Sequence, residues 1–99
     1  MTMAMGTRPL TIDDFARRVG KTVEAEAGGQ RVAMVVRAAQ DLPTSGREGG
    51  SFRLEFMGPP NPMLGQGIFP FLLGGERFDI FIVPLSRDQS GVRYEAVFY

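Results

Sequence analysis

After residue 20, hydrophobic and polar residues alternate along the chain, which is the pattern of β-strands buried on one face. In "KTVEAEA" every second residue is apolar, "GGQ" interrupts the alternation, and "RVAMVVRAA" resumes it. Residues 21–38 are therefore predicted to form a β-hairpin. The segment "SFRLEFMG" alternates in the same way and predicts a strand with Phe52, Leu54 and Phe56 pointing inward.

Three further strands are predicted in the C-terminal third. "IFPFLL" and "RFDIFIVPL" flank "GGE", and "SRDQSG" leads into the final segment "VRYEAVFY". Pro70 indicates that the first of these strands lies at an edge or is bulged. The nearly continuous apolar run "RFDIFIV" indicates a strand covered on both faces. The last strand is expected to be a central member of the sheet, paired with residues 77–83.

Only residues 11–20, "TIDDFARRVG", follow the period of a helix. Thr11 and Asp14 have the spacing of a capping box, and Gly20 supplies a stop. The stripe predicted to pack on the sheet consists of Ile12, Phe15, Ala16 and Val19. Residues 1–10 are interpreted as a flexible lead-in, and residues 11–99 as a single β domain.

About six strands joined without intervening helices predict a mainly β protein. The alternatives are a small antiparallel six-stranded barrel and a sandwich, with one short N-terminal helix in either case. The barrel is favoured because closure removes the strand edges that such an apolar set would otherwise expose. The helix is then expected to plug or cover one end of the barrel.

Composition removes several classes of function. The 99 residues include no Cys and no His, so disulfides, thiolate metal sites and the commonest general base are absent. Eleven basic and eleven acidic residues give a formal net charge of zero, which argues against a nucleic-acid partner. No stretch reaches the roughly 18 apolar residues of a membrane span. The protein is expected to be cytoplasmic when synthesised, and later incorporation into an assembled or exported particle remains open.

The acidic residues do not match a known catalytic or cation-binding pattern well enough to predict such a site. Glu24 and Glu26 lie about 7 Å apart on one strand face, a separation that suits an inverting carboxylate pair. The interpretation preferred here is a solvated strand face with Arg or Lys neighbours. Asp13, Asp14 and Asp79 match no cation-binding loop. No catalytic residue, cofactor or metal ligand is therefore predicted, and the protein is not expected to be an enzyme.

The apolar residues exceed what one face of a six-stranded sheet must hide. Residues 58–67, "GPPNPMLGQG", form a stiff loop that carries two apolar side chains. One interpretation places all of the excess in the core. The hypothesis preferred here is a contact patch for another subunit, formed by Met63, Leu64, Ile68, Phe69, Phe71, Val97 and Tyr99. The alternative function is a small ligand-binding β-barrel that holds an apolar molecule.

Three segments carry a family resemblance: "DFARRVGKTVEAE" (14–26), "FRLEFMGPPNPMLGQGIFPF" (52–71) and "FDIFIVPLSRDQSGVRYEAVFY" (78–99). Their F-x-G-P, Q-G-x-Y/F and V-P-x-x-x-D-x-x-G-x-x-Y-E-A-x-F patterns resemble an uncharacterised bacterial family, a domain of unknown function. Its members often lie near phage-tail-collar-like proteins. The resemblance implies a structural role in a tail-like or fibre-like assembly, with a protein partner or copies of itself. It implies no catalytic residues.

Overall fold

The computed structural model describes residues 4–5, 9–43, 46–47 and 49–99, with side chains from residue 9 onward. The remaining part of the predicted lead-in, and residues 44–45 and 48 of the loop after the hairpin, lie outside the described residues. The elements in chain order are β1 (Ala4–Met5), α1 (Asp13–Ala16), β2 (Thr22–Ala27), β3 (Gln30–Asp41), β4 (Phe52–Gly58), β5 (Gly67–Leu73), β6 (Glu76–Asp88) and β7 (Gly91–Phe98).

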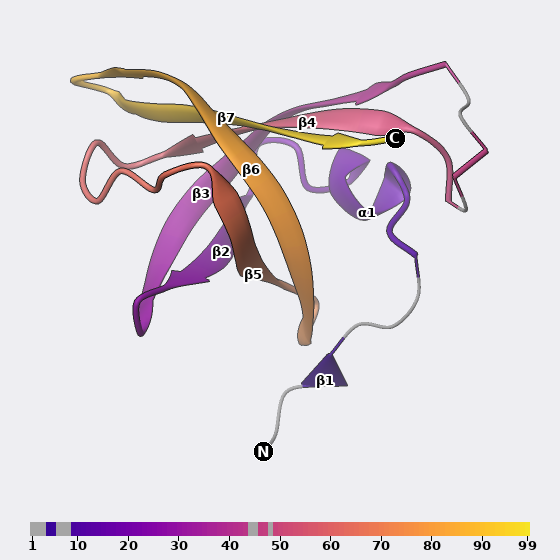
Figure 1. The fold of residues 1–99 in the computed structure, drawn as a ribbon, viewed down its shortest axis with the longest axis horizontal. Coiled ribbons are helices and arrows are strands. Elements are labelled where there is room, and N and C mark those ends of the chain that lie inside the picture. The colour runs from indigo at the N-terminus through magenta and orange to yellow at the C-terminus, as the bar shows by residue number, and fades with distance from the viewer. Residues whose placement is uncertain (1–3, 6–8, 44–45, 48) are drawn as a thin grey trace.

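Strands β2 to β7 form a closed antiparallel barrel (Figure 1). Two three-stranded meanders, β2–β3–β4 and β5–β6–β7, supply the strands. The β2–β5 and β4–β7 ladders join the meanders at their outer strands and close the barrel. Strand β1 adds to β6 in parallel. The mainly β fold with one short helix is thus confirmed, and the structure is the barrel rather than the sandwich.

The two longest strands, β3 and β6, each contain a register shift of the kind that bends a strand. In β3 the register shifts between Val36 and Ala38, and in β6 it shifts between Pro84 and Ser86. Strand β6 pairs with β5 as far as Ile82, and with β7 from Val83 onward. The prediction that the last strand pairs with residues 77–83 is therefore wrong. The last strand, β7, pairs with β4 along its length and with only the second half of β6.

The interior of the barrel is filled by the inward-facing half of each strand. Burial alternates strictly along β4, so the inward orientation of Phe52, Leu54 and Phe56 is confirmed. Burial also alternates along the first half of β6, where Asp79 and Phe81 are exposed. The prediction that "RFDIFIV" is covered on both faces is therefore wrong, because only one face of this strand meets the core.

The helix is shorter than predicted, since it ends at Ala16 and continues as turns. The Thr11 backbone N–H donates to Asp14 Oδ2 at 2.8 Å, which is half of the expected capping box. Phe15 is fully buried, whereas Ala16 and Val19 are exposed, so the predicted apolar stripe is wrong in its second half. Beyond Ala16 the chain no longer follows the helical period that would have turned Val19 inward.

The helix α1 lies close to the C-terminal end of β7 (Figure 1), and aromatic side chains pack together between these elements. The ring centroid of Phe15 lies 6.2–6.3 Å from those of Phe52, Phe56 and Phe98. Phe52 and Phe98 stack at 4.5 Å. The Arg47 guanidinium lies over both stacked rings, 5.5 and 5.2 Å from their centroids. The expectation that the helix covers one end is confirmed, and this cluster also holds the C-terminal strand in place.

Candidate functional site: an exposed apolar face

The outer face of β5 and β6 carries a pair of apolar residues where a solvated strand would carry polar ones. Ile68 and Phe81 are register partners on the two strands. Their side chains are 66% and 48% exposed, respectively. Directly opposite side chains of an antiparallel pair lie about 5 Å apart at Cβ, so the two form one continuous apolar surface.

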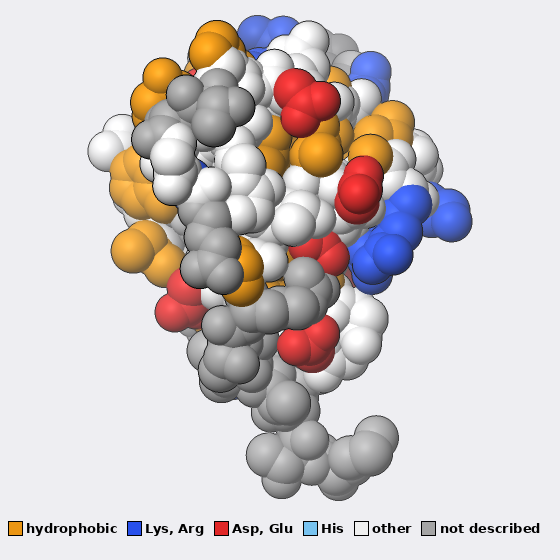
Figure 2. All heavy atoms as spheres, turned by 90° about the vertical axis from the view of Figure 1, so that its right-hand side faces the viewer, with side chains coloured by type: hydrophobic (Ala, Val, Ile, Leu, Met, Phe, Trp, Pro, Cys, Tyr) orange, Lys and Arg blue, Asp and Glu red, His pale blue; other side chains and the backbone are white. Residues whose placement is uncertain are grey.

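The outer side of β7 also carries exposed apolar residues, beyond the last pair of the β6–β7 ladder. Val83 of β6 pairs with Glu95 of β7, and Phe81 and Val97 each lie two residues beyond that pair on the same outer side. Val97 is 50% exposed, and Tyr99, which follows the strand, is 69% exposed. Strand β6 crosses in front of the barrel in Figure 1. Figure 2 views the molecule from the right of Figure 1, and hydrophobic side chains gather along its left side, with Lys and Arg mainly on the right.

The structure separates the seven predicted patch residues into three groups. Met63, Ile68, Val97 and Tyr99 are exposed. Phe69 is partly buried and packs against the core. Leu64 and Phe71 are buried in the chain's own core, so their assignment to the patch is wrong. The alternation of β5 turns Phe71 inward, and the loop folds the Leu64 side chain back into the barrel.

The loop before β5 is held firmly at two points. The Leu64 backbone N–H donates to the hydroxyl of the buried Tyr94 at 2.8 Å. Arg87 donates from Nε to the Pro60 carbonyl at 3.1 Å and from Nη2 to Asn61 Oδ1 at 2.6 Å. Met63 stands between these anchors with its side chain 45% exposed. A contact made by this loop would therefore cost little ordering entropy.

Sequence reasoning missed the central residue of the face, Phe81. The apolar run around it masked the alternation, but one polar residue marks the outer side of the strand. Asp79 lies two positions before Phe81 and therefore shares its face. Leu85, at the β6 bulge, was missed as well and is exposed.

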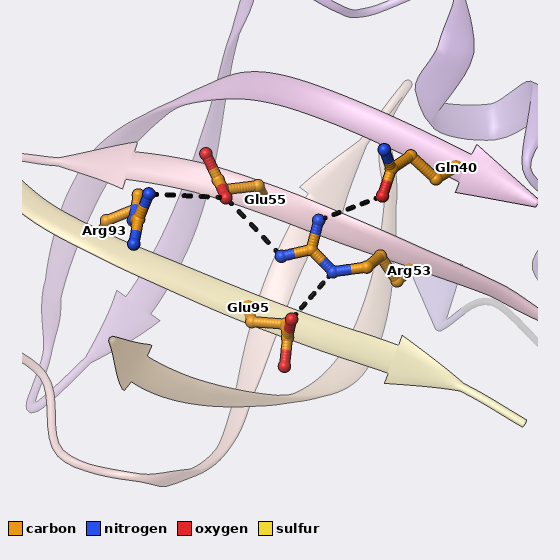
Figure 3. Close-up of polar contacts among 5 residues, drawn as sticks. All are labelled: Gln40, Arg53, Glu55, Arg93 and Glu95. Atoms are coloured by element: carbon orange, nitrogen blue, oxygen red, sulfur yellow. Dashed lines mark hydrogen bonds and ion pairs between the residues drawn. The ribbon is translucent and has the colours of Figure 1, made fainter. Parts of the chain in front are cut away.

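A charged network on β3, β4 and β7 borders the apolar face at Val97, whose register partner is Arg53 (Figure 3). Arg53 donates from Nε to Glu95 Oε2 at 2.7 Å and from Nη1 to Gln40 Oε1 at 3.1 Å. Its Nη2 lies 3.5 Å from Glu55 Oε1.

Because Glu55 and Glu95 are themselves register partners, Arg53 offsets their mutual repulsion. The hydrogen bond to Glu95 raises the pKa of the Arg53 guanidinium above its ordinary value. The network gives the apolar face a polar border on the β4 side.

The carboxylates considered for catalysis lie in ion pairs. Glu24 Oε1 is 3.8 Å from Arg31 Nη1, and Glu26 Oε1 is 2.8 Å from Arg77 Nε. The interpretation of this strand face as one with arginine neighbours is confirmed.

Among the described residues, no group of three or more acidic side chains is placed to hold a metal ion. Within the same residues, no helix has the length and apolar character needed to cross a membrane.

The fold and the face define a small closed antiparallel β-barrel with a filled interior and an apolar outer surface on β5, β6 and β7. The chain belongs to the family described as Domain of unknown function (DUF6916), whose model matches residues 10–98. The predicted membership of an uncharacterised domain family is confirmed. No curated protein and no solved structure matches the chain.

Proposed function

We propose that this protein is a non-enzymatic docking module that assembles with copies of itself or with a fibre-like protein partner. The exposed pair of Ile68 and Phe81 on the outer face of β5 and β6 is the observation that carries this proposal. The sequence resemblance adds the setting of a tail-like or fibre-like assembly.

The energetics favour covering this face. Fully burying a large apolar side chain contributes about 1.5–3 kcal/mol. Between 48% and 69% of the surface of each of four residues stays in water: Ile68, Phe81, Val97 and Tyr99. Each would therefore contribute roughly 1 kcal/mol on docking. The formal net charge of zero leaves no overall repulsion between copies.

The filled interior favours docking over the alternative of a ligand-binding barrel. Phe56 and Phe71 are fully buried, and their ring centroids lie 5.2 Å apart. Tyr94 is also fully buried and reaches the loop at the barrel end. A barrel of six strands has little interior beyond what such side chains occupy. The ion-paired Glu24 and Glu26 likewise favour a non-enzymatic role.

Sedimentation velocity over roughly 1–500 µM, the range of weak to moderate affinities, tests the proposal. We expect the mass of the wild-type protein to rise with concentration, or to rise when the product of the neighbouring gene is added. Ile68→Lys should weaken the association at least tenfold because it places a charge in the apolar face. Thr22→Lys, on an exposed position of β2, is the matched control and should change it less than twofold.

A wild-type protein that keeps the mass of one chain under both conditions would contradict the proposal. Equal effects of Ile68→Lys and Thr22→Lys would contradict the assignment of the docking surface to β5 and β6.

A further inference from the structure

A small basic patch lies around Val19, in the connection between α1 and β2. The Val19 side chain is apolar and yet 46% exposed. The Gly20 N–H donates to the Val36 carbonyl at 2.7 Å, and the Val36 N–H donates to the Lys21 carbonyl at 2.9 Å. These two bonds hold the backbone of Lys21 beside β3, next to Arg37.

The two cations of this patch are free to meet a partner. Lys21 and Arg37 are both exposed. No ion pair among the described residues includes either of them. Arg37 stands at the register shift of β3, where a bulge leaves one residue without a place in the ladder. The basic patch, defined by Val19, Lys21 and Arg37, thus combines an exposed apolar side chain with two unpaired positive charges.

The apolar face on β5 and β6 carries the opposite charge. Asp79 lies on the same outer side of β6 as Phe81, and both are exposed. Arg77 also lies on that side, but it is paired with Glu26 at 2.8 Å. Asp79 takes part in none of the ion pairs within the described part of the chain. Its carboxylate therefore gives the face around Ile68 and Phe81 a negative charge.

The basic patch and the apolar face lie on opposite walls of the barrel. In the closed ladder, β4 and β7 separate β3 from β6 on one side, and β2 and β5 separate them on the other. Figure 2 shows a similar division, with hydrophobic side chains along its left side and Lys and Arg mainly on its right. A partner docked on one of these surfaces therefore leaves the other one free.

Building on the proposed function, we propose that the apolar face of one copy docks on the basic patch of the next, so that copies join head to tail. Ile68 and Phe81 of one copy then cover Val19 of the other. Asp79 meets Lys21 and Arg37 in the same contact.

Charge favours this arrangement over a symmetric one. Docking of the apolar face on itself about a two-fold axis would bring two Asp79 carboxylates into one interface, and like charges in an interface are unfavourable. In the head-to-tail contact the same carboxylate meets unpaired cations. Each docked copy keeps one free surface, so further copies can add, and such contacts give open chains unless the rotation closes a ring.

The size of the apolar face predicts weak individual contacts. Ile68, Phe81, Val97 and Tyr99 together expose on the order of 400 Å² of side chain, taking about 200 Å² for a fully exposed large side chain. That is about half of what each partner contributes to a standard interface. Exposed ion pairs add little affinity and mainly fix the orientation of the partners. The number of copies in a chain should therefore rise with concentration.

Two variants with complementary defects test the head-to-tail contact by sedimentation velocity. Ile68→Lys disrupts the apolar face and keeps the basic patch, and Lys21→Glu/Arg37→Glu does the reverse. All three positions are exposed, so both variants should fold. Each variant alone should associate at least tenfold more weakly than the wild type. An equal mixture should form a complex with one copy of each variant and grow no further, because only one pair of intact surfaces remains.

Matched controls isolate the basic patch from charge changes elsewhere. Arg31→Glu lies on β3 as well, and it removes only an exposed ion pair with Glu24, which contributes little. It should change the association less than twofold. Thr22→Lys adds a cation beside the basic patch without changing the sign of its charge, so it remains the control for Ile68→Lys.

Exchanging the charges tests the pairing itself. Asp79→Lys should weaken the association, and combining it with Lys21→Glu/Arg37→Glu in one chain should restore it. A double variant that associates as tightly as the wild type would overturn this inference and leave the docking function standing. A monomeric wild type that binds the product of the neighbouring gene would do the same. A wild type that associates with neither would overturn both.

Discussion

Phe15→Ala is expected to lower the free energy of unfolding by about 3–5 kcal/mol, the usual cost of deleting a buried phenylalanine. Phe15 is the only aromatic residue that α1 contributes to the core, and its ring meets Phe52, Phe56 and Phe98. Its loss would open a cavity at the end of the barrel and release the turn that covers it. Chemical denaturation followed by far-ultraviolet circular dichroism measures the change.

Phe81→Ala is the matched control, because it removes the same side chain from an exposed position. Measured at low concentration, where the chain is a monomer, it should change the free energy of unfolding by less than about 1 kcal/mol. Similar losses for the two variants would contradict the assignment of Phe15 as the plug of the barrel.

Gly91→Ala is expected to cost at least about 4 kcal/mol in the free energy of unfolding, which would place it among the rare severe substitutions. Gly91 begins β7 with φ +148°, a conformation that favours glycine, and a Cβ there would lie 2.2 Å from the Gly58 carbonyl oxygen. Gly58 pairs with Val92 at the end of the β4–β7 ladder. Relief of the clash would therefore separate two strands whose pairing closes the barrel.

Gly75→Ala is the control that measures the cost of backbone strain alone, without the steric clash expected for Gly91→Ala. Gly75 has φ +85° in the β5–β6 turn, but a Cβ added there would meet nothing within 4 Å. This variant should lose only about 1–2 kcal/mol, the cost of a left-handed conformation for an L-residue. If both variants lost equal stability in thermal and chemical unfolding, the close approach of Gly91 to Gly58 would not be the cause.

Local alternation was enough to predict most of the strands. The hairpin of β2 and β3, with its turn at Gly28 and Gly29, follows from period-two patterning and two consecutive glycines. Which strands become neighbours could not be predicted in this way, because pairing depends on where a long strand bends. Strand β6 changes neighbour between Ile82 and Val83, just before the bulge at Pro84 and Ser86, and nothing in the alternation marks this change.

The candidate site was only partly predictable for a related reason. The sequence analysis placed Ile68, Val97 and Tyr99 in the surface patch, and all three are exposed. Leu64 could not be placed, because its burial depends on a tertiary hydrogen bond to Tyr94, 30 residues away. Phe81 was hidden by apolar neighbours on both sides, and the sequence shows its orientation only through Asp79.

Hydrogen–deuterium exchange at increasing protein concentration tests most directly whether another copy covers this face. The exchange of backbone amides reports local protection. We expect amides in residues 78–82 to exchange more slowly as the concentration rises, while those in residues 22–36 stay unchanged. Exchange in residues 78–82 that is independent of concentration, in a sample whose mass shows association, would contradict the account.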